Sequence, residues 1–80
     1  MSTHPDTIAD AALEASIYAA RAGGPRDACM SMARELIAEE LGIDNARAAR
    51  LFRRAMVRRG LKSPDPEIRE QAARIHFRSQ

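Results

Sequence analysis

Glycine and proline residues divide this chain of 80 residues into four segments, each about as long as one α-helix. The divisions fall at residues 23–25, at Gly42 and at residues 60–66. Glycine and proline are the residues that most strongly interrupt regular structure. Between them no stretch alternates apolar and polar residues as a strand would. The sequence therefore predicts an all-α fold, a small bundle of about four helices that forms a single domain over residues 1–80. The predicted helices cover about residues 6–22, 25–41, 44–59 and 65–77.

Residues at the ends of these segments match the preferences of helix termini. Asp and Ser side chains at an N-cap accept hydrogen bonds from free N–H groups, proline suits the first turn, and glycine suits the C-terminal end. The terminal residues predicted on this basis are Asp6, Asp44 and either Ser63 or Asp65 as N-caps, Pro25 in a first turn, and Gly60 as a C-cap.

Apolar positions predict which side of each helix is buried. The first predicted helix is apolar around most of its circumference, apart from a polar stripe between Asp10 and Arg21, and such a helix is normally buried on several sides. The chain has few aromatic residues, and a small domain buries little surface alone, so we expect a homodimer to add apolar contact. The inward positions of the second and fourth helices are Cys29, Ala33, Leu36, Ile37, Leu41, Ile68, Ala72 and Ile75.

Cellular location is indicated by what the chain lacks. Cys29 is the only cysteine, so no intramolecular disulfide can form, and its apolar neighbours predict a buried thiol. Residues 1–10 have neither the basic nor the apolar stretch of a secretory signal. No apolar run of about 18 residues is present. We therefore expect a cytoplasmic protein without a membrane-spanning segment.

Charge is distributed unevenly along the chain. Residues 1–40 hold three arginines against seven acidic residues, a formal charge of −4. Residues 41–80 hold ten Arg or Lys against four acidic residues, a formal charge of +6. This asymmetry indicates an anionic partner for the second half. The acidic half could also face the basic half within the fold or across a dimer.

The sequence around Gly42 has the spacing of two helices joined by a tight turn. Ala38 falls where two helices would cross closely, and Gly42 falls where the turn needs a left-handed backbone. Residues 34–54, about a quarter of the chain, thus resemble the helix-turn-helix of bacterial and phage regulators. The apolar positions that would hold the two helices together are Leu41, Ile43 and Leu51, with Ile37 behind them.

The resemblance implies a small regulator of transcription that binds double-stranded DNA. In that family the second helix of the motif lies in the major groove, and its outward N-terminal residues contact bases. Arginine can pair bidentately with guanine and asparagine with adenine, and an arginine face also binds phosphates. By position, the resemblance assigns to the groove Asn45, Ala46, Ala49, Arg50 and Arg53, with Arg54 close by. The helical period adds Arg47 and Arg58 to the same side, so the predicted DNA-binding residues are Asn45, Arg47, Ala49, Arg50, Arg53, Arg54 and Arg58.

A second interpretation treats the same residues as an ordinary helical bundle. Ala38 and Gly42 would then be a close-packing residue and a C-cap, and the arginines a solvated face paired with acids of the neighbouring helix. That helix carries Glu35, Glu39 and Glu40, which would repel a DNA backbone. The chain would then be a non-enzymatic protein-binding module, such as a phage or plasmid inhibitor or adaptor that docks on a larger protein or nucleoprotein complex. RNA association is a third interpretation, disfavoured by the shortage of exposed aromatic residues.

No residue pattern indicates catalysis, a metal or a cofactor. His4 and His76 have no carboxylate or cysteine at metal-ligand spacing. The adjacent Glu39 and Glu40 point to different faces of a helix, so they do not form an acid–base pair. We therefore expect a binding protein without enzymatic activity, and without a metal or cofactor.

Overall fold

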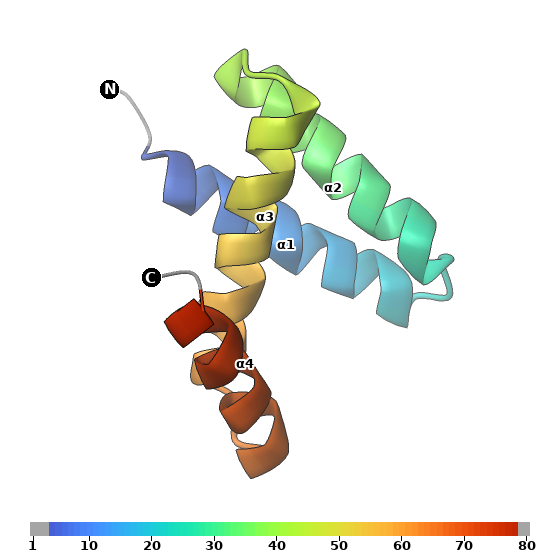
Figure 1. The fold of residues 1–80 in the computed structure, drawn as a ribbon. Helices are drawn as coiled ribbons and strands as arrows, with labels where there is room; N and C mark the ends of the chain where they lie inside the picture. The colour runs from blue at the N-terminus through green and yellow to red at the C-terminus, as the bar shows by residue number, and fades with distance from the viewer. Residues whose placement is uncertain (1–3, 79–80) are drawn as a thin grey trace.

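The computed structural model describes residues 4–78, and all regular structure in that range is helical. The predicted all-α bundle is confirmed, and each helix begins and ends within two residues of its predicted bounds. No helix in this range is long and apolar enough to span a membrane. Figure 1 shows the four helices in chain order, α1 (Pro5–Arg21), α2 (Arg26–Leu41), α3 (Asn45–Leu61) and α4 (Pro66–Arg78).

The first three helices form a compact unit to which the fourth is attached. Each of α1, α2 and α3 packs against the other two, whereas α4 packs only against α3 within the described residues. In Figure 1, α4 lies beside the C-terminal half of α3, away from α2. The N-terminal half of α3 therefore lies next to α2 and the turn between them, and the C-terminal half next to α4.

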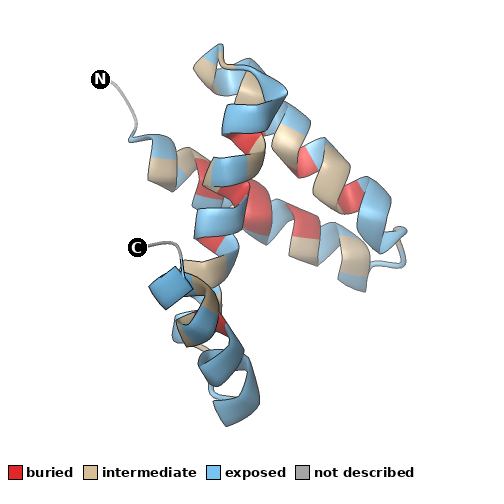
Figure 2. Ribbon diagram, in the orientation of Figure 1, coloured by how far each residue is buried: buried red, intermediate tan, exposed pale blue. Residues whose placement is uncertain are grey.

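The core lies where α1, α2 and α3 meet (Figure 2). Its large side chains are Leu13, Ile37 and Phe52, all of them buried. Because alanine is small, the helices approach closely, but each alanine contact buries little apolar area. The alanines of this core cluster are Ala9, Ala12, Ala33, Ala48 and Ala55, and none of its residues comes from α4.

Side-chain caps begin α3 and α4 as predicted. Asp44 Oδ1 accepts a hydrogen bond of 2.7 Å from the backbone N–H of Arg47. Asp65 Oδ1 accepts one of 2.9 Å from the N–H of Glu67. Each of these bonds satisfies a donor that the first turn of a helix leaves free.

The N-cap of α1 lies two residues before the predicted one, and α2 begins one residue later than predicted. His4 rather than Asp6 is the N-cap of α1, and its Nδ1 accepts a hydrogen bond of 3.1 Å from the Asp6 N–H. Pro5 explains the difference, because the fixed φ of proline suits the first helical position. Pro25 is the N-cap of α2 rather than part of its first turn.

The prediction that Gly60 ends α3 was wrong. The helix continues to Leu61, with Lys62 as its C-cap. Gly60 faces α4 instead, where a Cβ added to it would lie 2.8 Å from the Cβ of Ala72. Gly60 therefore lets the two helices approach each other closely.

Several apolar positions are less buried than predicted. Cys29, Ile37 and Ala72 are buried as expected, but Leu36 and Ile68 are 43% and 47% exposed. The outer side of α1 is also uncovered in the single chain and carries exposed alanines, so its predicted burial on several sides was wrong for one copy. These side chains leave apolar surface available to a partner.

Candidate nucleic-acid interface

The turn between α2 and α3 has the backbone that the sequence predicted. Gly42 adopts the left-handed conformation, with φ 62° and ψ 38°. The N–H of Ile43 donates a hydrogen bond of 3.0 Å to the carbonyl oxygen of Ala38. This bond closes the end of α2, and the Asp44 cap starts α3 two residues after Gly42. The connection between α2 and α3 is thus only three residues long (42–44), which fixes where the first turn of α3 lies relative to α2.

Apolar side chains hold α3 against α2 and the core. Leu41, Ile43 and Leu51 are partly buried and pack against the core cluster, and Ile37 is fully buried behind them. Ala48 has no exposed surface. The start of α3 is thereby supported by packing on one side, which leaves its opposite side in solvent.

That opposite side carries four exposed arginines, Arg47, Arg50, Arg53 and Arg54. Within residues 4–78, none of the four has an acidic partner. At about 100° and 1.5 Å per residue, the first, second and fourth of them fall on one stripe that spans roughly 10 Å. We call these four residues the arginine face.

The other predicted DNA-contacting residues lie around the arginine face. Asn45 and Ala46 are exposed in the first turn of α3, and Ala49 is half-buried. Ala46 and Ala49 have short side chains, so the backbone of α3 is accessible between the arginines. The structure therefore brings six of the seven predicted site residues to the first three turns of one helix.

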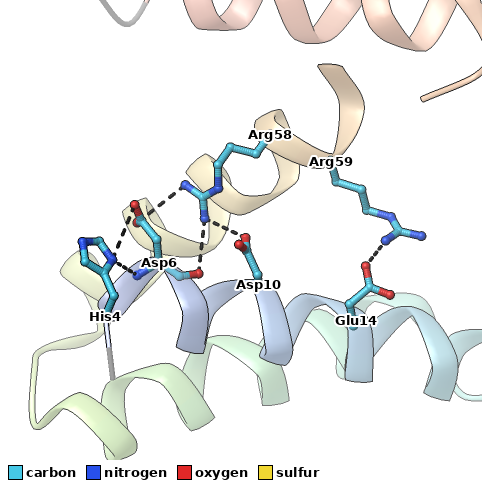
Figure 3. A network of polar contacts seen from close by, with 6 residues as sticks. All are labelled: His4, Asp6, Asp10, Glu14, Arg58 and Arg59. Atoms are coloured by element: carbon cyan, nitrogen blue, oxygen red, sulfur yellow. Dashed lines mark hydrogen bonds and ion pairs between the residues drawn. The ribbon is translucent and has the colours of Figure 1, made fainter. Parts of the chain in front are cut away.

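The seventh residue, Arg58, is placed differently, as Figure 3 shows. Its Nη2 donates a hydrogen bond of 2.7 Å to Asp10 Oδ1 and a second of 3.4 Å to the carbonyl oxygen of Asp6. Its Nη1 lies 3.5 Å from Asp6 Oδ1. The next residue, Arg59, pairs with Glu14. Both guanidinium groups are thus bound to acids of α1. This pairing connects α1 to the C-terminal half of α3.

The acids predicted as partners of the arginines were Glu35 and Glu39 of α2, and that prediction was wrong. Both line a groove between α1 and α2, together with Leu36. The side of α2 that faces α3 carries Arg34 instead, whose guanidinium carbon lies 5.9 Å from the centre of the Phe52 ring. The acids of α2 therefore do not cover the arginine face.

The positive charge of α3 is thus distributed unevenly: it is unpaired in the N-terminal half of the helix and neutralised by acids of α1 in the C-terminal half. α3 contains six arginines and no acidic residue. Among residues 4–78, four of these arginines have no acidic partner and two are paired. Free guanidinium groups on an exposed helix can bind phosphate oxygens or the edges of bases. In the described part of the chain, no group of three or more His, Cys, Asp or Glu residues could hold a metal ion.

Comparisons of the chain with protein-family models, with curated proteins and with solved structures gave no significant match. Its function is therefore inferred from the geometry of the site.

Proposed function

We propose that this protein is a small DNA-binding regulator, in which α2 and α3 form a helix-turn-helix and α3 enters the major groove. One observation carries the proposal: the arginine face is exposed and has no acidic partner among residues 4–78, directly after the left-handed turn at Gly42. A helix that presents unpaired guanidinium groups from its first turns is suited to a polyanionic groove.

The residues divide into two roles. Asn45, Arg50 and Arg53 lie where base edges would be read, because a recognition helix contacts bases with its N-terminal outward residues. Arg47 and Arg54 would bind the phosphates that flank the groove. Ala49 would allow close approach of the helix. Arg58 is not part of this proposed set, since its guanidinium is bound to α1.

A direct test is binding to fluorescent duplexes of randomised sequence at low salt, followed by selection of preferred sequences. Arg50→Ala and Arg53→Ala should each weaken binding to a selected site by roughly 5- to 150-fold, the equivalent of about 1–3 kcal/mol for a lost base contact. Arg78→Ala is a matched control, because this exposed arginine lies at the end of α4. Absence of duplex binding by the folded protein would exclude the proposal.

Salt dependence separates the two roles. The logarithm of the binding constant should fall linearly with the logarithm of salt concentration, since each neutralised phosphate releases counterions. Arg47→Ala or Arg54→Ala should reduce that slope by about one and weaken all sequences similarly. A slope that these variants leave unchanged would remove Arg47 and Arg54 from the phosphate-binding role.

A second candidate function is a protein-binding helical module. The observation that favours it is apolar: seven large apolar side chains of residues 4–78 are more than a third exposed, among them Tyr18, Met32 and Phe77. Exposed apolar side chains that lie together often mark a binding site, and Met32 and Leu36 line one groove between α1 and α2. Affinity capture from a nuclease-treated extract distinguishes this function, because a protein partner would survive nuclease and a DNA-mediated one would not. Both candidates describe a cytoplasmic binding protein rather than an enzyme.

A further inference from the structure

A large open groove lies away from the arginine face, between α1, the start of α2 and the region where α3 meets α4. Its volume is about 1040 Å³. That exceeds the usual range for small-molecule pockets, which is roughly 300–1,000 Å³. The groove is open to solvent, because Met56 and Ile68, which line it, are 38% and 47% exposed.

The floor of the groove is apolar. Leu13, Ile17 and Met30 line it from the three-helix unit, Met56 comes from α3 and Ile68 from α4. The first three are buried or half-buried, so they are held in place by the core. Such a floor buries apolar side chains of a ligand, but it gives a phosphate backbone no donor.

The edges of the groove are positively charged. Arg21, Arg26 and Lys62 line it, are exposed, and have no acidic partner among the described residues. The two acids in its lining, Asp10 and Glu14, are already paired with Arg58 and Arg59. Three free cations therefore surround an apolar floor, and the free charge of the groove is entirely positive.

We propose that this groove binds an acidic amphipathic helix of a protein partner. Apolar side chains at positions i, i+3, i+4 and i+7 of such a helix would lie on the floor, and its carboxylates would reach Arg21, Arg26 and Lys62. Charge complementarity selects the acidic class of helix. The inference does not depend on DNA binding, and it gives the second candidate function a surface and a class of partner.

The test uses a fluorescein-labelled peptide of about 15 residues, long enough to form helix on binding, with leucine at the apolar positions and glutamate elsewhere. Fluorescence anisotropy with the full-length protein should show saturable binding. A scrambled peptide of the same composition, and a version with lysine in place of glutamate, should bind at least tenfold more weakly. Equal binding of the scrambled peptide would overturn the proposal, because charge alone would then explain it.

Variants of the protein locate the binding surface. Met56→Glu and the double change Arg21→Glu with Arg26→Glu should each weaken peptide binding at least tenfold. Phe77→Glu places a glutamate on an exposed apolar residue outside the groove, and Arg78→Glu reverses one exposed charge there. Both should leave binding within about twofold. Circular dichroism confirms that each variant is folded. The proposal is overturned if the groove variants bind like wild type, or if the control variants weaken binding equally.

Competition with DNA keeps this proposal separate from the first. Unlabelled duplex DNA should not displace the peptide, and Arg50→Ala should not weaken peptide binding, because Arg50 does not line the groove. Displacement by duplex would mean that the groove belongs to a nucleic-acid surface and would overturn the proposal. Peptide binding by a protein that binds no DNA would support the groove and exclude the regulator.

Discussion

Gly60 lies inside α3, where a glycine normally weakens a helix by roughly 0.5–1 kcal/mol relative to alanine. Its replacement by alanine should nevertheless destabilise the protein. The new methyl group would lie 2.8 Å from the Cβ of Ala72, which is too close for two carbon atoms. Overpacking of this kind costs about 1–3 kcal/mol. We therefore predict that Gly60→Ala lowers the free energy of unfolding, measured by urea denaturation.

Exchange of the two residues is the matched control. Gly60→Ala combined with Ala72→Gly moves the methyl group from one helix to the other and restores the gap. The double variant should recover most of the stability that the single variant loses. If Gly60→Ala instead stabilises the protein, the close contact between α3 and α4 is not maintained in solution.

Gly42 and Gly60 show what sequence can predict at single residues. Both were predicted to end helices, and only Gly42 does, with its φ of 62°. The end of α2 is a local property, because the left-handed backbone follows from the residues next to it. The role of Gly60 depends on Ala72, which lies in a different helix. Residue preferences carry no information about such a neighbour.

α4 packs on α3 alone within the described residues, and the core cluster of the other three helices includes none of its residues, so we expect those three helices to fold without it. An isolated helix of 13 residues, by contrast, is marginal in water. A chain ended after Ser63 should therefore remain helical, unfold cooperatively on heating and keep any DNA binding. Circular dichroism and thermal unfolding measure the first two properties.

The same truncation should abolish binding of the acidic peptide, because it removes Ile68 from the groove. The stability that the truncated chain loses is also an upper limit for the destabilisation by Gly60→Ala. If the clash cost more free energy than the docking of α4 on α3 contributes, α4 would detach instead. Loss of cooperative unfolding in the truncated chain would show that α4 is part of the core, contrary to the packing described above.

At the level of elements, the sequence predicted the helices well and their side-chain partners poorly. Periodicity placed the arginines on the side of α3 opposite Phe52, as observed for the arginine face. Which arginines are free was not predictable. The pair Arg58–Asp10 joins residues 48 positions apart, and it forms because α1 crosses the C-terminal half of α3. The i, i+4, i+8 spacing of Asp6, Asp10 and Glu14 was the signal of this acidic stripe in the sequence.

Over the whole molecule, the uneven charge of the sequence is explained in part by pairing within the fold, the second of the causes considered at the outset. Part of it is neutralised internally, where acids of α1 meet Arg58 and Arg59 (Figure 3). Of the other cations in residues 41–78, the four of the arginine face and Lys62 at the edge of the groove have no acidic partner among the described residues. Because these surfaces lie at opposite ends of α3, DNA and a protein partner could be bound at the same time.

A two-fold dimer is the last expectation at this scale, and the face formed by α1 and α2 is suited to it. Exposed Ala15 and Ala19 on α1 lie in a groove beside the exposed side chains of Met32 and Leu36 on α2. Large side chains next to an alanine-lined groove can be self-complementary, as a two-fold interface requires, because each copy would insert Met32 and Leu36 into the groove of the other.

Met32→Glu should therefore produce a monomer, which sedimentation velocity would measure against a dimeric wild type. A glutamate at position 32 would add a further negative charge beside Glu35 and Glu39, which line the same groove, and its desolvation and repulsion would favour dissociation. Met56→Glu places the same charge on an exposed methionine of another surface and should leave the dimer intact.

If the protein is a DNA-binding dimer, its two α3 helices should protect half-sites about 34–36 Å apart, and the Met32→Glu monomer should lose one of them. A wild-type protein that is monomeric at the concentrations at which it binds DNA would contradict the dimer, and α1 and α2 would then offer this apolar face to a different protein.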